Sequence, residues 1–271
     1  MPARLDDRAV IALSGQDARS LLQGLITNDI EKLAPGCAVY AALLTPQGKI
    51  LFDFIIAEGD GAVLLDCAAA TADALVKRLT MYRLRAKVDI QRRDQLVVMA
   101  GWSSGTPLPG IAFTDPRLPA LGTRSIMAAA EAPARAETVE AYRAHRLDLG
   151  VPESADFGQD RMFALDADLE QLHGVDFGKG CYVGQELTAR MKHRGTARKR
   201  LLPIATTDGT ALPAPDTAVT AGGKSVGEIA SSYGARGFAL IRLDRLEEAA
   251  AAPLSAAEKS VTLSKPGWLF A

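Results

Sequence analysis

The chain has 271 residues, of which 48% are hydrophobic and 23% are charged. This composition is typical of a folded protein and excludes disorder as the main state. The 31 lysine and arginine residues nearly balance the 32 aspartate and glutamate residues, which leaves a net charge of -1. That balance excludes a general polycation for nucleic acid and a strongly acidic chain, so any charged partner must be bound by a local patch.

The cysteine and histidine residues indicate neither disulfides nor a metal site. Cys37, Cys67 and Cys181 form no CxxC pair and no paired framework, which is typical of a reducing compartment. The three histidines include no HxxxH pair. The N-terminus lacks the apolar core of a signal peptide, and the apolar run at 37–44 is far shorter than the ~20 residues that span a membrane. We therefore expect a cytoplasmic protein with no metal and no membrane partner.

The first hundred residues alternate between strand and helix patterns. Ser14 is expected to cap a helix with Asp17 as the return half of a capping box, and apolar residues follow at helical spacing as far as Ile26. A turn is expected at residues 45–48. The expected strands are residues 10–13, 38–44, 49–56, 63–67 and 96–100, and the expected second helix is residues 70–83.

The second half of the chain is less regular. Residues 102–119 are rich in Gly, Pro and Ser and are expected to form a loop. Residues 128–147 are alanine-rich and are expected to be mostly helical, with a break at Pro133. A short amphipathic segment at 165–172 and a helix at 184–192 follow. Beyond Arg200 the pattern indicates a separate small β-domain with short strands at 201–205, 226–231, 238–243 and 260–263.

The densest chemical signal is the segment GKGCYVGQE at residues 178–186. Its three glycines permit close backbone approach and unusual φ values. Cys181 lies two residues after Lys179 and just before the predicted helix, and both a cation and a helix N-terminus stabilise a thiolate. One interpretation is a reactive or ligand-contacting thiol. The other is a buried cysteine packed in a glycine-rich turn.

Residues 190–200 contain six lysine or arginine residues and no acidic residue. Three interpretations stay open for this stretch: a track for RNA phosphates, a cradle for a ligand with several carboxylates, and a solvated basic face. Tyr182 is the one aromatic residue nearby, so base stacking has weak support and nucleic acid is not the expected partner.

Two polar positions in the N-terminal part of the chain are further candidates. Alternation in residues 49–56 places Asp53 on one face with Leu51 and Ile55, where a carboxylate is costly without partners. Asp53 would either accept hydrogen bonds from an amino-substituted heterocycle or face water from an edge strand. Asn28, at the end of the first predicted helix, belongs either to a simple turn or to the lining of a site.

The motif KGCYVGQE at 179–186 resembles the signature of the YgfZ family of folate-binding proteins, whose mitochondrial counterparts act in late iron–sulfur cluster assembly. Residues 223–240 resemble the family's C-terminal barrel. A wider resemblance joins the chain to aminomethyltransferase, the T-protein of the glycine cleavage system. Four further stretches carry the resemblance: LQG with TND at 22–29, LLTPQGKI at 43–50, RLDLGVP at 146–152 and LTAR at 187–190.

The resemblance implies an α+β fold with three lobes, like that of aminomethyltransferase, around a channel that binds tetrahydrofolate. Residues 1–199 would form two lobes that are interleaved in sequence, and residues 200–271 would form the C-terminal β-barrel.

The same resemblance implies roles for individual residues. Asp53, Tyr142 and Arg8 would contact the pterin ring, and Arg190 with its neighbours would attract the glutamate tail. Lys179 and Cys181 are the candidates for chemistry, in which Lys179 would hold Cys181 near its thiolate state at the mouth of the channel. The other cofactor-binding candidates are Asn28, Tyr182, Gln185 and Glu186.

The function implied is that of a tetrahydrofolate-binding accessory protein for the assembly or maintenance of [4Fe–4S] enzymes, including radical enzymes that modify tRNA. Its partners would be folate and iron–sulfur clients or cluster carriers. One cysteine cannot hold a cluster alone, so any cluster would be shared. One alternative is a folate-dependent methyl or aminomethyl transferase with Asp53 as its acid. Another is an RNA-binding module at 190–200.

Overall fold

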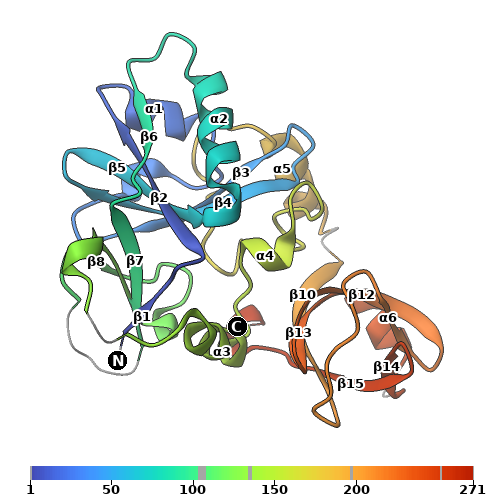
Figure 1. The fold of residues 1–271 in the computed structure, drawn as a ribbon. Helices are drawn as coiled ribbons and strands as arrows, with labels where there is room; N and C mark the ends of the chain where they lie inside the picture. The colour runs from blue at the N-terminus through green and yellow to red at the C-terminus, as the bar shows by residue number, and fades with distance from the viewer. Residues whose placement is uncertain (1, 103–107, 134–135, 196–197, 251, 271) are drawn as a thin grey trace.

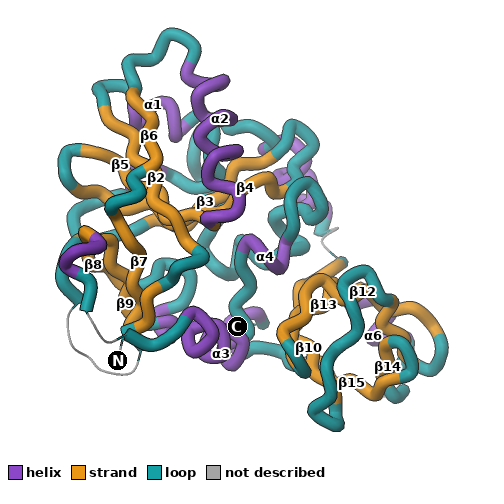
Figure 2. The backbone as a smooth tube through the Cα atoms, in the orientation of Figure 1, coloured by secondary structure: helices purple, strands orange, loops and turns teal. Residues whose placement is uncertain are grey.

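The computed structural model describes residues 2–102, 108–133, 136–195, 198–250 and 252–270. The chain folds into three lobes, of which two are built on open β-sheets and one is a closed β-barrel (Figure 1). Strands make up the body of each lobe, and long loops join the lobes (Figure 2). The three-lobed, aminomethyltransferase-like architecture expected from the resemblance is confirmed.

The first lobe is a five-stranded antiparallel sheet in the order β3-β4-β5-β2-β6. One of its faces packs against two helices, which contribute Leu22 and Leu75 to a buried cluster that also contains Phe54. The strands are β2 (Arg8–Ser14), β3 (Val39–Leu44), β4 (Ile50–Gly59), β5 (Ala62–Ala68) and β6 (Asp89–Arg92), and the helices are α1 (Ala18–Gln23) and α2 (Ala72–Arg83).

The second lobe shows how the chain interleaves two sheets. β1 (Ala3–Arg4) precedes the first lobe in sequence but pairs with β7 (Leu96–Gly101) of the second sheet. The order of that sheet is β1-β7-β9-β8, with β9 (Thr123–Ala128) and β8 (Ile111–Thr114). Helix α3 (Val139–Leu149) follows, and it ends at Gly150, which adopts the left-handed conformation that a side chain would disfavour.

The third lobe is a barrel closed in the order β10-β13-β12-β11-β14-β15. Closure pairs both edges of the sheet and leaves no edge strand exposed. Its strands are β10 (Lys199–Thr206), β11 (Ala218–Ala221), β12 (Lys224–Tyr233), β13 (Arg236–Arg242), β14 (Leu254–Ala256) and β15 (Lys259–Leu263), and α6 (Leu243–Glu248) follows β13.

One buried cluster joins the three lobes. It includes Val10 from the first sheet, Ile126 from the second and Phe238 from the barrel. After α3, the helices α4 (Ser154–Phe157) and α5 (Gln185–Arg194) also precede the barrel in sequence. The lobes therefore meet around a common centre, and side chains from all three can reach it.

Several local predictions are wrong. Ser14 does not cap a helix, because β2 continues through it and pairs it with Asp89. Asp17 occupies the N-cap position of α1 without a side-chain capping bond, and its carboxylate instead accepts a hydrogen bond of 2.8 Å from the amide of Lys87.

The alanine-rich segment 128–147 is also not mostly helical. β9 ends at Ala128, and the helix begins only at Val139. Ala128 is the last residue of β9 and pairs with Leu96, and residues 129–131 form only a single 3-10 turn. The loop expected at 102–119 contains β8, and its residues 103–107 lie outside the described residues. Within the described part of the chain, no helix is long and apolar enough to cross a bilayer.

Candidate functional site

Cys181 lies in an exposed loop that is fixed on both sides of the thiol. Residues 175–184, here called the Cys181 loop, contain no regular helix or strand and lead into α5. The cysteine is exposed, whereas Lys179 and Tyr182 on either side of it are only 8% and 7% exposed. The loop therefore turns two side chains inward and leaves the sulfur accessible between them. Of the two interpretations of Cys181, the buried cysteine in a turn is excluded.

Lys179 anchors this loop to the end of α1. Its Nζ donates to the main-chain oxygens of Gln23, Ile26 and Asn28 at 2.8, 2.6 and 2.9 Å. An ammonium has three N–H donors, and all three are used. Burial lowers the pKa of Lys179 to about 8. We expected Lys179 to keep Cys181 near its thiolate state. The hydrogen bonds of the Lys179 ammonium give this hypothesis no support, because they go to main-chain oxygens and not to the sulfur.

Two other contacts fix the path of the loop. Asp176 accepts hydrogen bonds from the amides of Gly178 and Lys179 and pairs with Lys32 at 2.6 Å. Gly184 adopts φ +83°, and a Cβ there would lie 2.5 Å from the main-chain oxygen of Thr45. Only glycine fits this position, so the loop must pack closely against the turn between β3 and β4.

Helix α5 carries the remaining residues predicted near the thiol. Gln185 and Glu186 form its first turn, and Arg190 pairs with Glu186 at 2.7 Å on its exposed side. In the basic stretch 190–200, Lys192 pairs with Glu170 and Arg198 lies 3.8 Å from Asp244. Because acidic residues elsewhere in the fold neutralise part of this stretch, it is a weaker RNA track than its sequence suggests.

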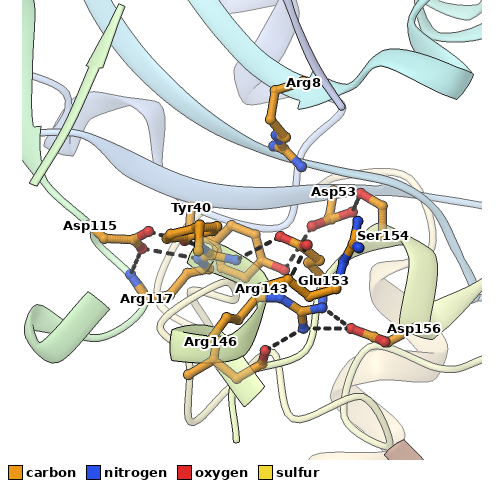
Figure 3. A network of polar contacts seen from close by, with 12 residues as sticks. Arg8, Tyr40, Asp53, Asp115, Arg117, Arg143, Arg146, Glu153, Ser154 and Asp156 are labelled. Carbon is orange, nitrogen blue, oxygen red and sulfur yellow. Dashed lines mark hydrogen bonds and ion pairs between the residues drawn. The ribbon is translucent and has the colours of Figure 1, made fainter. Parts of the chain in front are cut away.

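A network of buried charges, here called the central network, fills the centre where the lobes meet (Figure 3). Arg8 donates to Asp66 from Nε at 2.6 Å and to the main-chain oxygen of the same residue from Nη2 at 2.7 Å. Arg124 donates to the second oxygen of Asp66 at 2.6 Å. Each of these side chains is at most 6% exposed, so the pairs lie in a medium that screens charge poorly.

The second sheet extends this network. Asp115 accepts hydrogen bonds from Arg117 at 2.8 and 3.0 Å and from Arg124 at 2.9 Å. Although burial opposes ionisation, the charges of Arg117 and Arg124 hold the pKa of Asp115 at about 2. The hydroxyl of Tyr142 accepts from Arg117 at 3.1 Å and from Arg124 at 2.8 Å.

The barrel side of the network is organised by Arg146. Its Nη1 donates to Asp156 at 2.7 Å, and its Nε lies 3.1 Å from Glu153. Burial raises the pKa of Glu153, but the charges of Arg146, Arg8 and Arg117 outweigh it and hold the pKa at about 2. Asp156 also accepts hydrogen bonds from Ser231 and Tyr233, which ties the barrel to the centre.

Asp53 differs from the other carboxyl groups of the network. It is 3% exposed and accepts hydrogen bonds from the hydroxyls of Tyr40, at 3.1 Å, and Ser154. Among the described residues it forms no ion pair, whereas Asp66, Asp115, Glu153 and Asp156 each pair with arginine. Burial raises its pKa, and Glu153 adds to this effect while Arg8 opposes it. Of the arginines near Asp53, Arg8 pairs with Asp66 and Arg117 pairs with Asp115 instead.

The predicted neighbours of Asp53 are half right. Ile55 lies on the same buried face, but Leu51 packs on the other face with the first lobe's cluster. A register shift between Leu43 and Leu44 causes this difference, since Phe52 pairs with Leu43 and Ile50 with Leu44, which leaves Leu51 as the extra residue. The alternative of a charge facing water from an edge strand is excluded by the burial of Asp53.

Tyr40 links the central network to the Cys181 loop. Its hydroxyl donates to Asp53, and its main-chain oxygen accepts a hydrogen bond of 2.8 Å from the side chain of Asn28. The main-chain oxygen of Asn28 in turn accepts from Lys179. The structure therefore divides the predicted residues into two groups: Arg8, Asp53 and Tyr142 at the centre, and Asn28, Lys179, Cys181, Tyr182, Gln185, Glu186 and Arg190 around the loop and α5.

The fold implies a reduced folate at the centre, and the central side chains can be compared with a pterin ring. Arg8 and Tyr142 do not fit the roles expected for them. Arg8 already donates two hydrogen bonds to Asp66. The ring of Tyr142 already contacts other groups, because its centroid lies 5.8 Å from the centroid of the Trp102 ring and 5.3 Å from the Arg124 guanidinium. Asp53 does fit, because the hydroxyl donors can rotate away and a carboxylate matches the ring N–H and 2-amino N–H groups at the edge of a pterin.

Most members of the central network were not predicted as site residues. Asp66 could have been predicted from the sequence, because it is a charged residue in an otherwise apolar strand, as Asp53 is. Arg124 lies in β9, a strand for which the sequence analysis made no prediction. The members missed by the sequence analysis are Tyr40, Asp66, Asp115, Arg117, Arg124, Arg146, Glu153, Ser154 and Asp156.

The described residues contain no cluster of three or more His, Cys, Asp or Glu side chains that could hold a metal ion. The exposed thiol of Cys181 is a soft metal ligand in the Cys181 loop. The other ligands of any metal cluster bound there would have to come from another molecule.

Comparisons with known proteins agree with the observed fold. The GCVT N-terminal domain matches residues 8–102, and the CAF17 C-terminal β-barrel domain matches residues 198–271. The chain is 33% identical over 305 residues to the human protein named iron–sulfur cluster assembly factor IBA57, mitochondrial, and the match covers 98% of this chain and 84% of that protein.

A second relative and one solved structure extend the comparison. The IBA57 homolog of Mycosarcoma maydis is 41% identical over 226 residues, which cover 74% of this chain but only 56% of that longer protein. The crystal structure of glycine cleavage system aminomethyltransferase T from Bartonella henselae superposes with a TM-score of 0.76 at 15% identity. It covers 98% of this chain and 85% of that one, which shows a common fold.

The names of the relatives correct one expectation. They are described as mitochondrial proteins, which overturns the cytoplasmic location predicted from the sequence. The physical reason is that unpaired cysteines indicate only a reducing environment and do not distinguish one reducing compartment from another.

Proposed function

The chain belongs to the family of IBA57 iron–sulfur cluster assembly factors, and on this premise we propose that it is a tetrahydrofolate-binding accessory protein for the assembly or maintenance of [4Fe–4S] enzymes. Radical enzymes that modify tRNA are among the clients we propose. The observation that carries the proposal is the exposed sulfur of Cys181, which lies between two buried anchors.

The Cys181 loop is suited to present one thiolate to a partner. Lys179 and Tyr182 fix the main chain on both sides of the cysteine, so little conformational entropy is lost when the sulfur binds. Iron–sulfur clusters are held by several thiolates, and this loop supplies one. The cluster is therefore a cargo that the chain shares with a carrier or client, which supplies the other ligands.

Rescue of cells that lack this protein tests the proposal. Cys181→Ala should fail to restore the activity of a [4Fe–4S] enzyme, because the shared ligand is lost. Cys37→Ala removes the other exposed thiol and is the matched control, which should restore activity as the wild type does. Equal rescue by Cys181→Ala and the wild type, at equal protein levels, would show that the thiol has no such role.

The folate part of the proposal rests on Asp53. When bound, tetrahydrofolate would supply a nitrogen that carries one-carbon units, and the Asp53 carboxylate would hold the amino edge of its pterin. Arg190 and the neighbouring cations of α5 would attract the glutamate tail. Because the carboxylate must be ionised to accept two N–H donors, folate binding should weaken as the pH falls through the raised pKa of Asp53.

A titration with tetrahydrofolate tests this part separately. Asp53→Asn should weaken binding about tenfold, because an amide accepts only through one oxygen. Asp60→Asn, in an exposed turn, is the control and should bind as the wild type does. Wild-type binding that is independent of pH and unchanged in Asp53→Asn would remove Asp53 from the folate site.

Asp53 also supports a second candidate function, folate-dependent aminomethyl or methyl transfer. A buried carboxyl group with a raised pKa and no cationic partner is suited to general acid–base catalysis. Turnover with tetrahydrofolate and a methylamine-loaded carrier, lost in Asp53→Asn, would establish this activity. Absence of turnover at saturating tetrahydrofolate would exclude it.

A further inference from the structure

The C-terminal end of α2 exposes large apolar side chains that the fold does not use. Met81 is 62% exposed and Leu84 is 86% exposed, whereas Leu75 and Leu79 on the opposite side of the helix are fully buried. The two buried leucines already attach the helix to the sheet of the first lobe. Met81 and Leu84 are therefore not needed for that packing.

Cations surround these apolar side chains. Residues 77–87, here called the α2 tip, contain five lysine or arginine residues and no acidic residue, in a chain whose net charge is -1. Within the part of the chain that the structure describes, none of the five forms an ion pair within 4.0 Å. The five are Lys77, Arg78, Arg83, Arg85 and Lys87.

The shape of the α2 tip decides what kind of surface it suits. α2 and its connection to β6 project at the edge of the first lobe (Figure 1). Leu84 follows the last helical residue with φ +46°, a backbone conformation that costs energy for a leucine. An apolar side chain at a projecting end, ringed by cations, enters a soft planar surface more readily than it fills a groove.

We propose that the α2 tip is a docking surface for an anionic phospholipid bilayer. Leu84 and Met81 enter the boundary between headgroups and acyl chains, and the five cations remain at the level of the phosphates, as long basic side chains do at such interfaces. Each cation near an anionic surface adds to the attraction, which salt weakens. The contact is peripheral, so it requires no membrane-spanning helix.

Vesicle flotation of the full-length chain tests this proposal. The chain should float with vesicles of phosphatidylcholine containing about one third phosphatidylglycerol and remain behind with phosphatidylcholine alone. Binding should fall steeply between about 0.05 and 0.5 M salt because the Debye length shortens. Failure to float with the anionic vesicles at low salt would overturn the proposal.

Two variants separate the apolar and charged contributions. Leu84→Gly should weaken binding about tenfold, because the variant lacks the leucine side chain that enters the bilayer. Glycine tolerates the positive φ, so loss of folding does not account for that result. Arg85→Glu should weaken binding further at low salt, and Lys224→Glu, which makes the same charge change in an exposed hairpin of the barrel, should not.

Two outcomes would contradict the bilayer assignment. One is equal weakening by Arg85→Glu and Lys224→Glu, which would mean that overall charge alone is responsible. The other is binding of a short single-stranded RNA that competes fully with the vesicles and is insensitive to Leu84→Gly, which would identify a nucleic-acid surface instead.

Discussion

The central network and the Cys181 loop are linked through Tyr40, but they differ in whether their polar groups are buried or exposed. In the network, buried carboxyl and guanidinium groups are almost all satisfied by one another. At the loop, the buried ammonium of Lys179 donates to main-chain oxygens at and after the end of α1, while the sulfur of Cys181 is exposed. The centre therefore joins the three lobes, and the loop presents the thiol that we propose as the functional group.

This difference bears on what the aminomethyltransferase-like architecture can bind. The centre of such a fold can hold a ligand, but here arginine and aspartate side chains take up most of the donors and acceptors. Among the described residues of the network, Asp53 is the carboxyl group that forms no ion pair with arginine. Four changes, in order of decreasing expected effect, test this difference between the two regions.

Arg124→Met should be the most damaging change. It removes the partner of Asp66, Asp115 and Tyr142 and leaves two buried carboxylates less compensated, which costs about 3–5 kcal/mol of unfolding free energy. Arg161→Met breaks an exposed pair with Asp216 and should cost at most about 1 kcal/mol. Denaturant unfolding measures both. Equal costs would mean that the central network does not hold the lobes together.

Gly184→Ala should rank second and should act on the loop. At φ +83°, the new Cβ would lie 2.5 Å from the main-chain oxygen of Thr45. We therefore expect the free energy of unfolding to fall by about 2 kcal/mol. Because the loop must move, the rate of Cys181 alkylation should also change. Gly180→Ala meets no atom within 4 Å and should change neither quantity. An unchanged alkylation rate in Gly184→Ala would show that this contact does not position the thiol.

Acid should weaken the central network. The folded-state pKa values of Asp115 and Glu153 are about 2, below their ordinary values of 3.8 and 4.5. A depressed carboxyl pKa contributes stability above the unfolded value, and this stability is lost as the pH falls toward the folded value. The unfolding free energy should therefore drop by about 1–2 kcal/mol or more between about pH 4.5 and 2.

Glu153→Gln tests the source of that pH dependence. The variant should be less stable than the wild type at pH 7, and its stability should change less with pH below 4.5. The same pH slope in both proteins would assign the acid sensitivity to other carboxyl groups.

Tyr40→Phe should have the smallest effect and should separate the two regions. It removes the hydroxyl that donates to Asp53, which should cost about 1 kcal/mol. The link from Tyr40 to the loop passes through its main-chain oxygen, which the substitution keeps. Alkylation of Cys181 should therefore proceed at the wild-type rate. A changed rate would mean that the two regions are coupled through the phenol.

Much of the first lobe could be predicted from sequence because its signals are local. Alternation and the turn at residues 45–48 predicted β3 and β4, and the glycines of the segment 178–186 predicted an unusual loop before a helix. The bulge that moves Leu51 to the other face depends on pairing with β3, so it has no local signal.

The charged centre was harder to predict because its partners lie far apart in sequence. Asp66 meets Arg8 and Arg124 across 58 residues in each case, and only the assembled sheets bring them together. Lys179 illustrates the same limit. Its closeness to Cys181 in sequence suggested an effect on the thiol, but the path of α1 directs its ammonium to carbonyl oxygens.

The exchange of one thiolate ligand at Cys181 tests whether this sulfur can share a cluster. The full-length chain is incubated with a small synthetic iron–sulfur cluster that keeps its other synthetic thiolates when one is exchanged, and the iron and cluster chromophore that stay with the protein after desalting are measured. We expect the wild type and Cys37→Ala to retain the cluster chromophore and Cys181→Ala to lose it. Equal retention by Cys181→Ala would contradict the assignment of this sulfur as the ligand that the chain shares.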